Sequence, residues 1–300
     1  MCSVRIVHWL TDPFSVGFVL RALLGGSLVA VICGVVGTWV VIRGMAFLGE
    51  AVGHGMLPGV ALATVAGAPV MLGGAISAIT MSALIGVLQR RGRLSYDTSI
   101  GLLFVGMLSL GVIIVSHSRS FATDATAMLF GDILAIDQGD LMVLLVSTAL
   151  TLAIATGFHR SFVAAAFDPR IAQTLGLRPQ LAQLALVGLV TLAVVSSFQA
   201  VGSLLVVGLL LAPAVAAGPW TRTIPTRMVL ATAFGVLAVA TGLLCSWYAG
   251  TAAGASIAAA AIAFAPISGV LAQLSRRRRP APVAEPAAPA AFALDSPSGK

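Results

Sequence analysis

Charged residues are scarce in this 300-residue chain: they make up 9% of it, against about 25% in an average soluble domain. A water-soluble fold with so few charges would expose large apolar patches. Histidine and cysteine are also rare, and Cys2, Cys33 and Cys245 lie too far apart for paired zinc-ligand spacing or a disulfide framework. These shortages exclude a soluble globular domain, a zinc-finger module and a disulfide-rich secreted protein.

Signatures of several enzyme classes are absent from the sequence too. It contains no Gly-rich phosphate loop ending in Lys-Ser/Thr, no His-Glu-x-x-His and no Gly-x-Ser-x-Gly. The formal net charge of +7 would suggest nucleic acid in a soluble protein, but no basic stretch is interleaved with aromatic residues. We therefore expect no nucleic-acid partner and no ATP hydrolysis through a phosphate-binding loop of this chain.

What the chain has instead is apolar sequence. Hydrophobic residues make up 59% of it, and its mean hydropathy is +1.05. A spanning helix needs about 20 mostly apolar residues, and such segments cover residues 14–42, 46–66, 69–88, 98–117, 139–158, 181–199, 201–218, 227–247 and 253–273. The sequence predicts an all-α integral membrane protein with about nine transmembrane helices, embedded in a lipid bilayer. Residues 14–273 form its membrane domain, residues 1–13 an extracytoplasmic leader, and residues 274–300 a basic anchor with a disordered Pro/Ala-rich tail.

Arginines set the orientation of this membrane domain, because loops rich in Lys and Arg stay in the cytoplasm. Nearly every break after an odd-numbered span is basic: Arg43, Arg90, Arg91, Arg93, Arg160, Arg170, Arg178, Arg222, Arg227 and Arg276 to Arg279. The breaks on the opposite side carry mostly aspartate. We therefore expect the N-terminus outside and the C-terminus in the cytoplasm.

Glu50 and His54 are the most informative ionisable residues, since such groups are costly inside a bilayer and are functional by default. Their spacing of four residues puts both on one helix face, with His54 about 13 Å from a helix start near Met45. Carboxylate plus imidazole suits a divalent metal such as zinc, manganese or iron. The alternative is a hydrogen-bonded pair that only pins two helices together.

Two prolines predict helix kinks, Pro58 in the second span and Pro213 in the seventh. Pro58 has no N–H to donate to the carbonyl oxygen of His54. We expect a free backbone oxygen beside the imidazole as a result, and irregular backbone at this depth is tolerated only against protein or a water-lined cavity.

The longest cytoplasmic connection carries a short helical pattern over residues 168–176. Asp168 suits the N-cap, Pro169 the first turn and Gly176 the C-terminal cap, with Arg170 and Leu175 between them. The pattern predicts a docking helix that faces the cytoplasm, or alternatively an amphipathic loop lying on the lipid headgroups.

Three other polar residues are weaker candidates for an ion path. Asp97 begins the fourth span, where an N-cap role is the alternative. His117 lies at the external end of the same span. Asp132 belongs to an external connection, where carboxylates attract cations or are simply solvated.

The stretch around Glu50, residues 47–61 (FLGEAVGHGMLPGVA), resembles the signature of permease subunits of the zinc/manganese/iron ABC importer family. That signature pairs an acid, usually Asp, with His four residues later on the second helix. Further matches are Tyr96-Asp97-Thr98 with Gly101, Leu129 through Leu134, and Val201 through Leu205 followed by Pro213-Ala214. The resemblance extends over residues 14–273.

This resemblance implies a type II ABC importer permease of the bacterial plasma membrane. Its partners would be a second copy in a homodimer, two cytoplasmic ATPase subunits that receive the coupling helix 168–176, and an extracytoplasmic metal-binding protein. Glu50 and His54 would line the metal path, with no stably bound cofactor. The resemblance puts zinc first as the transported ion and manganese next, although residues 102–107 lack the additional histidine that zinc-type members often carry on the fourth helix.

Two other functions stay open. A stand-alone secondary transporter or channel could use Glu50 and His54 as an ion relay without any ATPase. An intramembrane metalloenzyme would need a third ligand or a nucleophile, which the sequence does not offer beside this pair.

Overall fold

The structure is a computed structural model that describes residues 12–13, 16–90, 95–116, 131–167, 173 and 176–277. Within these ranges it has nine helical segments long and apolar enough to cross a membrane, which confirms the predicted all-α membrane fold. The first span is one unbroken helix of 26 residues. The leader up to residue 11 and the tail from residue 278 lie outside the described residues.

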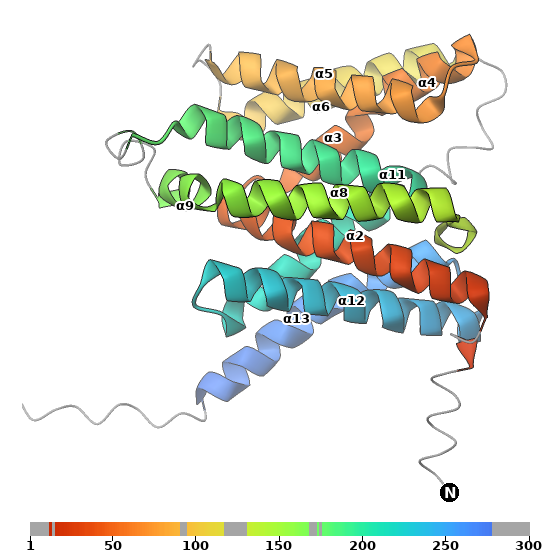
Figure 1. Ribbon diagram of the computed structural model, residues 1–300, viewed down its shortest axis with the longest axis vertical. Coiled ribbons are helices and arrows are strands. Elements are labelled where there is room, and N and C mark those ends of the chain that lie inside the picture. The colour runs from red at the N-terminus through yellow and green to blue at the C-terminus, as the bar shows by residue number, and fades with distance from the viewer. Residues whose placement is uncertain are drawn as a thin grey trace, which may run out of the picture.

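The long helices run side by side and lie roughly horizontally in Figure 1. In chain order they are α2 (Gly17–Ile42), α3 (Ala46–Gly55), α4 (Leu57–Ala66), α5 (Val70–Arg90), α6 (Tyr96–Ser116), η2 (Ile133–Ala135), α8 (Gln138–Gly157), α9 (His159–Phe167), α11 (Pro179–Ala217), η3 (Gly218–Trp220), α12 (Ile224–Ala249) and α13 (Ala253–Arg277). Together these helices form a layer. The first span begins at one side of the layer and the last span ends at the opposite side, as an odd number of crossings requires.

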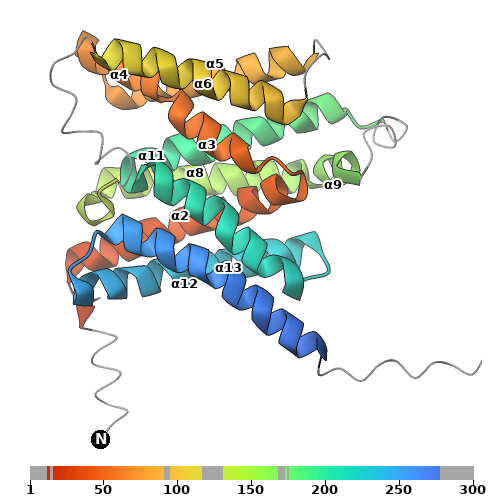
Figure 2. The ribbon, with the colours of Figure 1, turned by 180° about the vertical axis from the view of Figure 1, so that it is seen from behind.

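Helix α11 comprises two spans, Pro179–Phe198 and Ala200–Trp220, which meet at an angle in Figure 2. Gly202 lies at this corner with φ of 73° and ψ of 163°, a backbone conformation that is essentially restricted to glycine. The predicted spans 181–199 and 201–218 are therefore joined by a turn whose shape depends on this glycine.

The centre of the molecule is the contact between α2 and the second leg of α11. Trp39, Cys33 and Leu210 have no exposed surface. A Cβ atom at Gly37 would collide with the backbone carbonyl of Leu210, so the two helices touch backbone to backbone. In a membrane, association depends on such close packing because lipid is as apolar as the side chains.

A second group of helices, α4, α5 and α6, lies at one edge of the layer, and α3 crosses obliquely between it and α11 (Figure 2). The outward surfaces are apolar, with Ile76, Ile113, Val146 and Val229 each more than half exposed. Such surfaces suit contact with lipid chains, and α3 is the segment that carries ionisable side chains into this environment.

Candidate metal path

Helix α3 packs closely against two neighbouring helices through its own glycines. A Cβ atom at Gly53 would sit 3.6 Å from Cβ of Ser203 in α11, and one at Gly49 would meet the side chain of Leu210. Gly55 lies against Met81 of α5. The absence of side chains at these positions lets α3 lie deep between α11 and α5, which leaves one face of the helix open.

The open face carries Phe47, Glu50 and His54. Phe47 is 67% exposed, Glu50 is exposed and His54 is half-buried. The imidazole of His54 meets the ring of Phe104 in α6 edge to face, with ring centroids 5.4 Å apart. The predicted pair thus shares one face of one helix, and an aromatic ring holds the imidazole from the side.

The second span is interrupted at Met56, two residues before Pro58. The expected free carbonyl at His54 is not found, since the backbone N–H groups that cap α3 donate to the carbonyl oxygens of Gly53 and His54. The last turn is tightened, with Met56 N–H bonded to the carbonyl of Gly53 at 3.3 Å, and such i→i+3 bonds satisfy carbonyls at a helix end.

A side chain from α5 supports the same interruption. The hydroxyl of Ser77 donates to the carbonyl oxygen of Gly55 at 2.6 Å. Irregular backbone inside a membrane protein persists where neighbouring groups satisfy it in this way. Ser77 therefore helps to fix the direction of α3 relative to α4, and with it the position of His54.

The weaker candidates for the ion path lie elsewhere in the chain than Glu50 and His54. Asp97 is exposed in the first turn of α6, but Ser95 is the residue that caps this helix, because its hydroxyl accepts the N–H of Thr98 at 3.2 Å. His117 lies outside the described residues. No group of three His, Cys, Asp or Glu side chains within the described part of the chain could hold a metal. One protomer thus offers Glu50 and His54 as an incomplete ligand pair.

Asp132 is exposed next to η2, and its side chain makes no capping hydrogen bond. The neighbouring Gly131 lies so close to the corner of α11 that a Cβ atom there would collide with the backbone of Val201 and Gly202. Gly131 and residues 201–202, which are far apart in sequence, therefore meet at this corner.

Little of the predicted coupling helix 168–176 falls within the described residues. Asp168, Pro169, Arg170 and Leu175 lie outside them. Gly176 has φ of 72°, and its N–H donates to the carbonyl of Gln173 at 3.0 Å, a geometry that suits the end of a helical turn. Before this segment the chain forms α9, a helix that the sequence pattern did not reveal.

Pro213 lies inside the second leg of α11 and is buried. The non-helical backbone of α11 is at Gly202 rather than at this proline. Close to Pro213, the guanidinium of Arg227 donates from Nε and Nη2 to the carbonyl oxygen of Ala214 at 3.2 and 3.1 Å. The end of α11 is thereby tied to α12.

The sequence profile of the ABC 3 transport family matches residues 15–271 of the chain. The chain belongs to this family. It is 35% identical over 282 residues to the manganese transport system membrane protein MntC of Halalkalibacterium halodurans, a match that covers 92% of this chain and 97% of that protein. It is also 31% identical over 250 residues to the chelated iron transport system membrane protein YfeD of Yersinia pestis, covering 83% of each chain.

A solved structure, PsaBC from Streptococcus pneumoniae in complex with Fab, has the same fold, with a TM-score of 0.76. The identity is 29%, and the match covers 87% of this chain and 95% of that one. The resemblance inferred from residues 47–61 is thus confirmed. The protein is a permease subunit of a metal-ion ABC importer, a transporter component rather than an enzyme, and a multi-pass protein of the bacterial inner membrane.

Two residues of this permease's candidate site escaped the sequence argument. Phe104 is one of several apolar residues in the fourth span, and Ser77 is an isolated hydroxyl in the third. Neither has a sequence signal of its own, because each matters through a contact with a different helix, with His54 and Gly55 respectively.

Proposed function

We propose that this permease forms a homodimer and passes a divalent transition metal through an interface where Glu50 and His54 of both copies meet. The observation that carries the proposal is the exposure of Glu50 on the open face of a membrane-spanning helix. A carboxylate that faced lipid at this position would be strongly unfavourable. Protein or a water-filled path must cover it, and the face that holds it also holds the imidazole.

A second copy of the chain is the partner that fits this face. Two copies contribute two carboxylates and two imidazoles, whereas one contributes a single pair. Transition metals in proteins commonly take four or more ligands of these types. A site that is shared between copies and completed by water can bind the ion briefly and release it, as transport requires.

The energy for transport comes from cytoplasmic ATPase subunits, since the sequence has no phosphate-binding loop of its own. An extracytoplasmic binding protein delivers the metal. The arginine-rich breaks, including Arg43, Arg160 and Arg222, face the cytoplasm and the N-terminus lies outside. In this orientation residues 168–176 face the ATPase as a coupling helix.

We infer manganese or iron, rather than zinc, as the first candidate for the transported ion. The relatives named above are components of manganese and chelated iron transport systems. The fourth helix places Phe104, an apolar ring, against His54, where an additional imidazole would favour zinc.

Metal uptake by cells tests the proposal directly. A strain lacking its own importers is complemented with the wild-type permease system or with the double variant Glu50→Gln, His54→Ala, and its accumulation of manganese, iron and zinc is measured. We expect the double variant to lose uptake while its amount in the membrane stays unchanged. Unchanged uptake would overturn the assignment of the site.

Purification of the complex tests the source of energy. We expect an ATP-binding subunit to co-purify with the permease, and deletion of residues 168–176 to abolish this association. Metal flux by the permease alone in vesicles, without ATP, would instead favour the stand-alone secondary transporter.

A further inference from the structure

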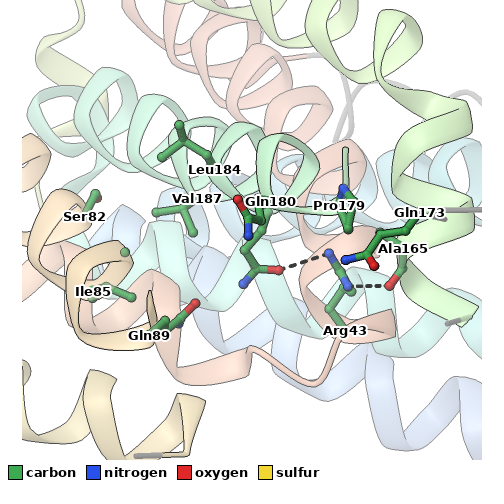
Figure 3. A pocket seen from close by; sticks show the side chains of 12 residues that line it. Arg43, Ser82, Ile85, Gln89, Ala165, Gln173, Pro179, Gln180, Leu184 and Val187 are labelled. Atoms are coloured by element: carbon green, nitrogen blue, oxygen red, sulfur yellow. Dashed lines mark hydrogen bonds between the residues drawn. The ribbon is translucent and has the colours of Figure 1, made fainter. Parts of the chain in front are cut away.

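Arg43 lies at the junction of α2 and α3, and in the described part of the chain it donates hydrogen bonds to residues of two distant helices. Its Nη1 donates to the carbonyl oxygen of Ala165 at 2.7 Å, and its Nη2 donates to Oε1 of Gln183 at 3.1 Å (Figure 3). Ala165 lies in the last turn of α9, and Gln183 lies near the start of α11. These two residues flank the connection that carries residues 168–176. We call the three residues Arg43, Ala165 and Gln183 the Arg43 bridge.

The junction that carries Arg43 is held by its own backbone. Gly44 has φ of 67°, its N–H donates to the carbonyl of Val41 at 3.2 Å, and the N–H of Met45 donates to the carbonyl of Val40 at 2.9 Å. This pair of bonds is the Schellman motif, in which a left-handed glycine closes a helix. A displacement of Arg43 is therefore passed on to the next helix rather than absorbed by a loose turn.

Helix α3 begins directly after this junction and carries the metal-path residues. With a rise of 1.5 Å per residue, Glu50 and His54 lie about 6 and 12 Å along the axis from Ala46. Gln183 makes a second, weaker contact at the base of this helix, from Nε2 to Sδ of Met45 at 3.9 Å. The flanks of the cytoplasmic connection are thus bonded to the end of the helix that presents the ligands.

A cavity separates the Arg43 bridge from α5. It has a volume of about 330 Å³, and the three bridge residues line it together with Ser82 and Gln89 of α5, Gln173 and Gln180 (Figure 3). Nε2 of Gln89 is buried and has no hydrogen-bond partner. Groups separated by a void exchange no contact forces. Among the described residues, hydrogen bonds therefore join the flanks Ala165 and Gln183 to Arg43, whereas the buried amide nitrogen of Gln89 in α5 makes none.

We propose that Arg43 is a positioning residue that transmits movement of the coupling segment to α3, and so joins ATP hydrolysis to the opening of the Glu50–His54 site. This inference rests on the proposed function. The guanidinium is suited to the task because its planar fork bonds two acceptors at once, which a lysine ammonium on a flexible stem does not reproduce.

The test uses the complete complex of permease, ATPase and binding protein in proteoliposomes, with manganese as the probe. Metal uptake and phosphate release are measured together, and their ratio is compared among wild type, Arg43→Met, Arg43→Lys and Gln183→Leu. Arg222→Met serves as the control, because Arg222 is an exposed arginine of the α11–α12 connection and its removal changes the charge in the same way. The lysine variant keeps the charge that orients the first span.

We expect Arg43→Met to assemble and to hydrolyse ATP while uptake per ATP falls about fivefold or more, the usual range for coupling between sites. The fall should be smaller in Arg43→Lys and Gln183→Leu, and absent in Arg222→Met. A wild-type ratio in the Arg43 and Gln183 variants would overturn the inference. If Arg43→Met does not assemble, the other two variants decide by the same criterion.

Failure of the proposed function gives a different pattern. In that case the wild-type complex shows no ATP-dependent manganese uptake, or its uptake survives the Glu50→Gln, His54→Ala substitutions, and the inference about Arg43 falls with it. If uptake depends on Glu50 and His54 but uptake per ATP does not depend on Arg43, only the inference about the Arg43 bridge is rejected.

Discussion

At the scale of single residues, the geometry of the proposed metal site depends on the length of the acidic side chain. Glu50 is one methylene longer than the aspartate usual in the family signature, and His54 is fixed from the side by Phe104. With the imidazole held in place, the carboxylate must be the group that adapts to the size and coordination of the ion. Under the proposed function, the choice of glutamate should therefore bear on selectivity as well as on affinity.

Shortening this ligand should shift the preference among metals. We expect Glu50→Asp to retain transport but to change the ratio of manganese to iron uptake several-fold, because metal–ligand distances tolerate deviations of only about 0.2 Å. Competition between the two ions in an uptake assay measures the ratio. Glu50→Gln is the control, and a ratio unchanged in Glu50→Asp would show that the carboxylate is not a ligand during selection.

The hydroxyl of Ser77 gives a second prediction at this scale, concerning stability. Ser77→Ala removes the bond to the carbonyl of Gly55 and should lower the free energy of unfolding by about 0.5–1.5 kcal/mol. Thermal unfolding in detergent measures the loss. Thr80→Ala is the matched control, since the Thr80 hydroxyl bonds only within its own helix, to the carbonyl of Ile76 at 2.7 Å. Equal losses in the two variants would contradict a special role for Ser77.

At the scale of helices, the corner in α11 shapes the centre of the molecule. The two legs of α11 contact α2, α3 and α13, and the direction of each leg depends on the backbone at Gly202. The close approach of Gly131 to this corner leaves no room for adjustment. A change in the turn would therefore disturb the packing around α3.

Replacing the glycine at this corner tests the argument. Gly202→Ala must place a Cβ at φ of 73° and should cost about 1–3 kcal/mol, visible as a lower unfolding temperature and less protein in the membrane. Gly188→Ala in the same helix is the control. A Cβ atom there would meet open space, so we expect no loss, or a small gain from the higher helix propensity of alanine. Comparable destabilisation in both variants would refute the role of the corner.

The spans and turns were the predictable part of the fold. Runs of about 20 apolar residues locate each crossing, and the boundary between the predicted spans 181–199 and 201–218 lies next to the corner at Gly202. The tightened carbonyl bonding after His54, the capping of α6 by Ser95 in place of Asp97, and helix α9 were missed. Each depends on contacts or local geometry that polarity and spacing leave undetermined, as the two bonds of Arg43 to α9 and α11 also do.

At the scale of the whole molecule, two broad surfaces remain outside the core and require different neighbours. The side seen in Figure 1 presents α2, α8 and α12, whereas the side seen in Figure 2 presents α3, α6 and α13. Both are largely apolar, but α3 adds the exposed carboxylate of Glu50. Lipid suits the first side, and a second protomer is the neighbour that suits the second.

Cross-linking in native membranes distinguishes the two sides. In a background where Cys2, Cys33 and Cys245 are replaced by alanine, single cysteines are introduced at Phe47 on α3 or at Val229 on α12, which are 67% and 72% exposed. A short bifunctional thiol reagent should yield dimers with Phe47→Cys, because in the proposed homodimer the α3 face lies between the copies. It should yield essentially none with Val229→Cys, whose neighbours are lipid chains, and labelling by a lipid-soluble maleimide verifies that this thiol is accessible. Dimers formed through Val229→Cys but not through Phe47→Cys would place the interface on the opposite side and would leave Glu50 without the partner that its exposure requires.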